Sequence, residues 1–189
     1  MRLRALALVG AVAAFEAAVL LPADSIEAHI VSHALVAHVA APLLVIGAPL
    51  RGPWPSPAVR RIGPLVAWAT FVAAHWAALL IAGTQHHLTG LDHLGVHAML
   101  LAAGVLFWLP VLGSGRLMPR LQGPAAALYL FLAMPAADLT AVWLMVRGET
   151  TAVGVMLAAM LPLGIAAVAV SWGWILREER LARAGEAAQ

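Results

Sequence analysis

The segment EAHIVSHALVAH, residues 27–38, places three histidines inside a strongly apolar stretch. His29 and His33 are four residues apart, so on a helix their imidazoles share one face. His38 would lie roughly 140° further around the same helix, and we therefore expect it on a different face. Because an ionisable side chain is costly to bury in hydrocarbon, these histidines are candidates for a functional site.

A second pair with the same spacing occurs in LDHLGVHAML, where His93 and His97 are again four residues apart. A further histidine, His75, stands alone in FVAAHW. Two such pairs on two helices can supply four imidazole nitrogens to one ion, or two nitrogens to each of two ions. Two HxxxH pairs in one chain therefore predict a site for a metal ion or for haem.

Softer donors and one acid accompany the histidines. Met156 and Met160 form another i,i+4 pair, and Asp138 shares a helix stripe with Met134 and Met145. Imidazole and thioether donors without thiolate favour copper over zinc or a hard cation. A methionine in an apolar helix is more often a packing residue, and an intramembrane aspartate can also serve helix association. We predict these metal ligands: His29, His33, His75, His93, His97 and Asp138.

The composition identifies the class of protein. Of the 189 residues, 63% are hydrophobic and 11% are charged, against about 25% charged in soluble domains, and the mean hydropathy is +0.92. The basic residues are all arginines in short gaps between apolar runs, which argues against a nucleic-acid partner. Cysteine is absent, which excludes disulfides, thiolate metal sites and iron–sulfur clusters. The composition therefore predicts an integral membrane protein.

Six apolar runs of about 20 residues are each long enough to cross a bilayer as a helix. They lie near 3–21, 27–50, 61–83, 92–113, 122–146 and 151–176. We predict an all-α integral membrane protein, a bundle of about six transmembrane helices forming one polytopic domain over 1–189, with a short polar tail at 177–189. The first run resembles a secretory signal, but Glu16 interrupts it and no A-x-A site follows, so we expect no cleavage.

Arginine placement predicts the orientation of this bundle. Ten of the eleven arginines fall at one side of the predicted spans, and Arg147 falls at the other. The positive-inside rule then places both termini in the cytoplasm. In this topology all eight histidines lie in the outer half of the membrane or in outer loops. We interpret two of them, His86 and His87, as solvated loop residues.

The histidine segments resemble a known family. AHIVSHALVAHVAAPLLVIGAPLR is similar to the pattern H-M-x-x-H-x-L-L…A-P-L-L…G-A-P of the CtaG-type cytochrome c oxidase assembly factors, with Ile30 in place of the methionine. LDHLGVHAMLLAAGVLFWLPVLG resembles a second family segment, H-x-x-x-H followed by F-W-x-P-V. His75 matches an isolated family histidine, and Asp138 in MPAADLTAVWLM matches the family's acidic position. The resemblance extends over roughly residues 20 to 150.

The resemblance implies a multi-pass protein of the bacterial plasma (inner) membrane that helps to build haem–copper oxidase by supplying copper. The implied partners are the oxidase subunits, a soluble copper donor on the outer side and the lipid bilayer. Two other classes stay open: a haem-binding electron carrier, and a scaffold for oxidase subunits without metal. We expect no enzymatic activity, because the sequence has no nucleophile–base set and no phosphate loop.

Overall fold

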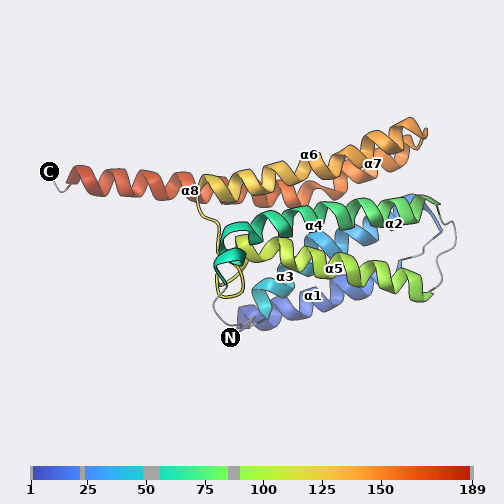
Figure 1. The fold of residues 1–189 in the computed structure, drawn as a ribbon, viewed down its shortest axis with the longest axis horizontal. Coiled ribbons are helices and arrows are strands. Elements are labelled where there is room, and N and C mark those ends of the chain that lie inside the picture. Colours follow the sequence, from blue (N-terminus) through green and yellow to red (C-terminus); the bar gives the residue numbers. More distant parts are fainter. Residues whose placement is uncertain (1, 22–23, 49–55, 85–89, 188–189) are drawn as a thin grey trace.

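The computed structural model describes residues 2–21, 24–48, 56–84 and 90–187, and this part of the chain is helical without strands (Figure 1). Its elements are α1 (Arg2–Leu20), α2 (Ile26–Ala34), the π-helix η1 (Leu35–Ala40), α3 (Ala41–Gly47), α4 (Pro57–Thr84), α5 (Gly90–Leu112), α6 (Pro124–Val146), α7 (Thr150–Ala159) and α8 (Leu161–Ala187). Six stretches of the described residues are long and apolar enough to cross a membrane. The predicted all-α fold with six candidate spans is confirmed.

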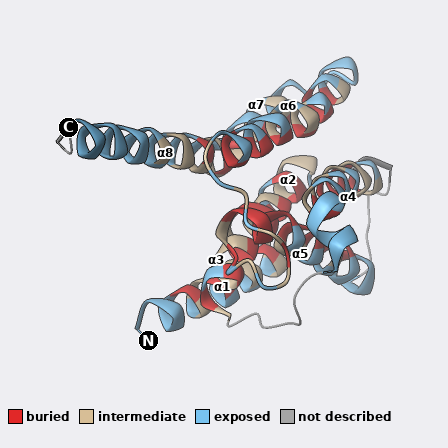
Figure 2. Cartoon of the chain, turned by 60° about the vertical axis from the view of Figure 1, so that its left-hand side comes forward, coloured by how far each residue is buried: buried red, intermediate tan, exposed pale blue. Residues whose placement is uncertain are grey.

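The six stretches lie side by side, and both chain ends lie at the same end of the bundle (Figure 1). The continuous run α2–η1–α3 is central, because it contacts α1, α4, α5 and α7. The last hairpin, α6 with α7 and α8, packs on this group through α6 against α4 and α7 against α2. Buried residues lie where these helices face one another (Figure 2). The chain runs along the bundle six times, an even number, and therefore begins and ends at the same end.

The second span contains a π-helical segment that the sequence analysis did not predict. In η1, the backbone N–H of Ala41 donates to the carbonyl of Val36, an i→i−5 bond instead of the α-helical i→i−4 bond. A π-helix has wider turns than an α-helix, so the regular i→i−4 backbone hydrogen bonds are interrupted here. The indole N–H of Trp108 on α5 donates to the carbonyl of Ala37 at 3.0 Å, so a neighbouring helix satisfies part of the irregular backbone.

The sixth span is broken near its middle. α7 ends at Ala159 and α8 begins at Leu161, with Pro162 in its first turn. Proline has no backbone N–H and its ring clashes with the preceding turn, which weakens the helix at this position. The break places the carbonyl of Ala159 within reach of α2 and η1.

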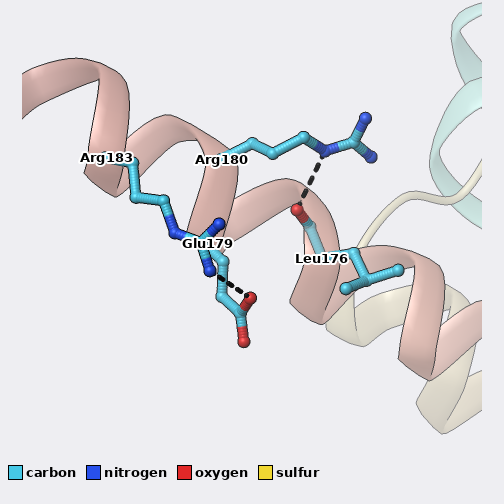
Figure 3. Close-up of polar contacts among 4 residues, drawn as sticks. All are labelled: Leu176, Glu179, Arg180 and Arg183. Atoms are coloured by element: carbon cyan, nitrogen blue, oxygen red, sulfur yellow. Dashed lines mark hydrogen bonds and ion pairs between the residues drawn. The ribbon is translucent and has the colours of Figure 1, made fainter.

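The predicted polar tail is helical. α8 continues to Ala187, and the side chains from Arg177 to Glu186 are exposed. Arg183 pairs with Glu179 at 3.4 Å, and the Nε–H of Arg180 donates to the carbonyl of Leu176 at 3.0 Å (Figure 3). Exposed i,i+4 pairs contribute only about 0.3–0.5 kcal/mol each, so they support this extension weakly.

Glycines allow two close helix contacts that fix the central run. A Cβ at Gly47 of α3 would lie 2.7 Å from Cγ of Leu8 on α1. A Cβ at Gly104 of α5 would lie 2.8 Å from Cβ of Ala41. Close backbone approach of this type is how membrane helices pack, since lipid supplies no hydrophobic force between them. These contacts set the depth at which α1 and α5 lie against the second span.

Candidate metal site

Four imidazoles form a closed ring between α2 and α5. The ring centroids of His29 and His33 on α2 are 5.9 Å apart, and those of His93 and His97 on α5 are 4.2 Å apart. Across the helices, His29 lies 5.6 Å from His93 and His33 lies 5.6 Å from His97. We call these four residues the four-histidine ring. The two HxxxH pairs that the sequence identified separately therefore face each other.

All four imidazoles are withdrawn from the surface, each less than 9% exposed. The Nε2 atoms of His29, His33 and His97 are buried and have no hydrogen-bond partner. A buried polar atom without a partner costs about 1–3 kcal/mol, and such an atom in a native structure calls for an explanation. A bound cation would give each of these nitrogens a partner.

The start of α2 fixes the chemical form of His29. Ser25 caps the helix, its Oγ accepting the N–H of Ala28 at 3.1 Å, and its carbonyl lies 2.9 Å from Nδ1 of His29. Because a carbonyl can only accept, Nδ1 carries the proton and Nε2 keeps a free lone pair. Metal-binding histidines use the same arrangement, donating one ring N–H to a carbonyl and binding the ion through the other nitrogen.

His75 and His38 lie together beneath the four-histidine ring. Their ring centroids are 6.3 Å apart, and Nδ1 of His75 and Nε2 of His38 are buried without a partner. His33 and His75 line one small cavity. His38 contacts His75 and Phe71 of α4, and none of its ring contacts among the described residues is to the four-histidine ring. The expectation that it lies on a different face from His33 stays a prediction.

His38 has the same chemical form as His29. Its Nδ1 lies 3.1 Å from the carbonyl of Ala159, so Nδ1–H donates and Nε2 keeps its lone pair. This bond ties η1 to the break between α7 and α8. His38 was not among the predicted ligands because regular α-helical rotation places it on a different face from His33.

Aromatic side chains close the space below these histidines. Phe71, one turn deeper on α4 than His75, stacks on Phe107 with ring centroids 4.2 Å apart. Phe107 in turn stacks on Tyr129 at 4.9 Å. Both phenylalanines are fully buried. The polar region therefore ends at a packed aromatic layer and does not continue along the bundle.

The rings would have to turn to coordinate an ion. Among the described residues, no three histidine, aspartate or glutamate side chains are already arranged so that they could hold a metal. The spacing nevertheless fits, because two nitrogens bound to one ion at about 2 Å are at most about 4 Å apart. The terminal torsion of histidine is broad, so imidazoles with centroids 4.2–5.9 Å apart can turn toward a common centre.

Asp138, the sixth predicted ligand, is on a different helix from the histidines described above. Asp138 on α6 is half-buried and its Oδ1 has no partner, and no ion pair or hydrogen bond within the described ranges joins it to a histidine. Met145, on the stripe of Asp138, is 60% exposed and faces away from the bundle. His86 and His87 lie outside the described residues. Five of the six predicted ligands are thus joined by ring contacts or by a shared cavity, and no hydrogen bond or ion pair among the described residues joins Asp138 to them.

Comparison with known proteins identifies the family of this chain. Residues 3–173 match the model of the cytochrome c oxidase caa3 assembly factor family, Caa3_CtaG. This match covers most of the chain and all of the histidines described above. The chain therefore belongs to the Caa3_CtaG family, and the resemblance found in the sequence is confirmed. No curated protein and no solved structure matches it.

Proposed function

We propose that this protein is a copper-binding assembly factor that supports delivery of copper to a haem–copper oxidase. Family membership supports the role in oxidase assembly. The observation that carries the copper assignment is the four-histidine ring, with three buried Nε2 atoms that have no protein partner. The proposed role is non-catalytic, which is supported by membership of a family of assembly factors.

The donors favour copper over the other common metals. The region around the ring offers neutral imidazoles, with thioethers close by, and thiolates are absent from the chain. Such a set suits copper better than Mg²⁺ or Ca²⁺, which require oxygen ligands. Imidazole ligands can also exchange one at a time, as delivery of an ion to a second protein requires.

The proposed orientation places the ring in the outer half of the bacterial inner membrane, with both termini in the cytoplasm. Support for it comes from the arginines, ten of which fall in the sequence on the same side of the predicted spans as both termini. A soluble donor on the outer side would then reach the ring, and the oxidase subunits would receive the ion within the bilayer. The aromatic layer at Phe71 and Phe107 supports a carrier and argues against a path across the membrane.

A haem-binding electron carrier is the main competing function. The cavity lined by His33 and His75 has a volume of about 10 Å³, whereas pockets for organic cofactors measure roughly 300–1,000 Å³. This size favours an ion. Visible absorption of the purified protein separates the two functions, because bound haem gives a Soret band and copper on imidazole does not.

The proposal is tested in cells by replacing the ring histidines. The double variants His29→Ala with His33→Ala, and His93→Ala with His97→Ala, should abolish oxidase activity. The protein should still insert, because alanine is more favourable than histidine within a span. The oxidase should keep its haem and lack copper. Added external copper should restore part of the activity, because mass action compensates for a weakened carrier.

The matched control is His86→Ala, in the loop between the third and fourth spans, which should leave oxidase activity near the wild-type level. Two results would contradict the copper function. Loss of haem from the oxidase in the ring variants would favour the haem carrier. Normal oxidase activity in these variants at limiting copper would favour a scaffold without metal.

A further inference from the structure

A small cavity lies on the side of His33 away from α5. It is lined by His33, His75 of α4, and Met156 and Met160 at the break between α7 and α8, together with Ile30, Ala34, Leu79 and Ala159. Its volume of about 10 Å³ suffices for one water molecule or one ion. Three separate spans contribute donors to it, so it forms only in the assembled bundle.

The four donors around this cavity are buried. Met156 is 1% exposed, Met160 is 2% exposed, His33 is 3% exposed and His75 is 6% exposed. Nε2 of His33 and Nδ1 of His75 have no hydrogen-bond partner. The remaining lining is aliphatic and supplies no polar group that could satisfy these nitrogens. The lining of the cavity therefore includes two imidazole and two thioether side chains.

We propose that this cavity is a second copper position, selective for Cu(I), with His33, His75, Met156 and Met160 as ligands. The inference rests on the copper-binding function proposed above and adds the deeper position and its oxidation state. Thioethers are soft donors that select Cu(I), and the absence of carboxylate from the lining disfavours Zn²⁺ and hard cations.

His33 belongs to both positions. Its ring lies 5.6 Å from that of His97 in the four-histidine ring, and the same side chain lines the cavity. A Cu(I) ion held by the ring can therefore move to the cavity by exchanging the α5 imidazoles for His75 and the thioethers while His33 stays bound. The oxidation state does not change in this exchange, so no electron donor is needed.

His38 positions the methionine side of the cavity. Its Nδ1–H donates to the carbonyl of Ala159, which directly precedes Met160 and itself lines the cavity. The bond holds the broken end of α7 against η1. The π-helical turns thus serve the deeper position, because they direct His38 toward the α7–α8 break.

The test is Cu(I) binding and copper X-ray absorption on the full-length purified protein, loaded anaerobically with Cu(I). The wild type should show sulfur as well as nitrogen scattering around copper. The double variant Met156→Leu with Met160→Leu should lose the sulfur scattering and bind Cu(I) at least tenfold more weakly at the deeper position. Leucine is close in volume to methionine, so the bundle should stay folded.

Met134→Leu is the matched control, because Met134 is also partly buried in the last hairpin but does not line the cavity. It should keep the wild-type spectrum and affinity. Nitrogen-only scattering in the wild type, or sulfur scattering that survives in the double variant, would overturn the inference while leaving copper on the four-histidine ring. A wild type that binds no copper would instead overturn the proposed function, and the inference with it.

Discussion

The imidazole of His33 on α2 lies beside that of His97 on α5, with 5.6 Å between the ring centroids, and both side chains are buried. This contact joins two helices that are distant in sequence and turns two separate histidine pairs into one ring. It depends on how deeply α5 packs against the second span. Residues that set this packing should therefore control metal binding without touching the metal.

Gly104→Ala should disrupt this register. The new Cβ would lie 2.8 Å from Cβ of Ala41 and 3.3 Å from the carbonyl oxygen of Ala37, so α5 must move away from the second span. We expect a stability loss of about 1–3 kcal/mol and weaker copper binding. Thermal unfolding in detergent and metal titration measure these effects. The control is Gly95→Ala on the same helix, whose new Cβ would meet nothing within 4 Å, so stability and copper binding should be preserved. Equal stability and equal copper affinity of the two variants would contradict the proposed effect of helix packing.

Trp108→Phe should destabilise the π-helical segment. The substitution removes the indole N–H that donates to the carbonyl of Ala37 and leaves that carbonyl buried without this partner. The expected cost is about 1–3 kcal/mol in the free energy of unfolding. Trp172→Phe is the control, because Trp172 is 61% exposed and the same change there should have little effect. Similar unfolding midpoints for the two variants would show that the bond contributes nothing.

Copper affinity should fall as the pH is lowered. An imidazole binds a metal through a nitrogen lone pair, and a proton competes for the same lone pair. Binding by several histidines should therefore release protons, and the apparent affinity should rise with pH. Titration with a competing chelator at several pH values measures the slope. An affinity that does not depend on pH would exclude imidazole as the main ligand.

Asp138→Asn should leave copper binding unchanged, although the sequence pattern placed Asp138 among the ligands. No hydrogen bond or ion pair within the described ranges connects its carboxyl to the histidines, and α6 does not carry any of them. Metal content of the purified variant is the measurement. A loss of bound copper comparable to that of a ring-histidine variant would show that Asp138 reaches the ion.

Local sequence rules predicted much of this fold because the bilayer demands long apolar helices. The six spans and both i,i+4 histidine pairs follow from length and from helical rotation. Pro162 was a local signal for the break near Met160, but Pro64, Pro110 and Pro135 lie inside continuous helices, so proline alone does not predict a break. The single span predicted over 151–176 did not include this break.

The π-helical turns and the methionine side of the cavity had no comparable local signal. LVAHVA, residues 35–40, is an ordinary apolar helical sequence, and its irregular backbone is satisfied in part by Trp108 from another span. Met156 and Met160 were visible as a pair, but their position beside His33 depends on α7 packing against α2. Such neighbour relations arise from tertiary packing, which the spacing within one helix does not encode.

The central claim is that the buried imidazoles bind copper, and metal analysis of gently purified protein tests it most directly. Wild-type protein loaded with copper should retain it through desalting and show no Soret band. The double variant His33→Ala with His97→Ala should lose most of this copper while giving the same yield of inserted, helical protein. A wild type that retains no copper, or a double variant that retains as much as the wild type, would contradict the account.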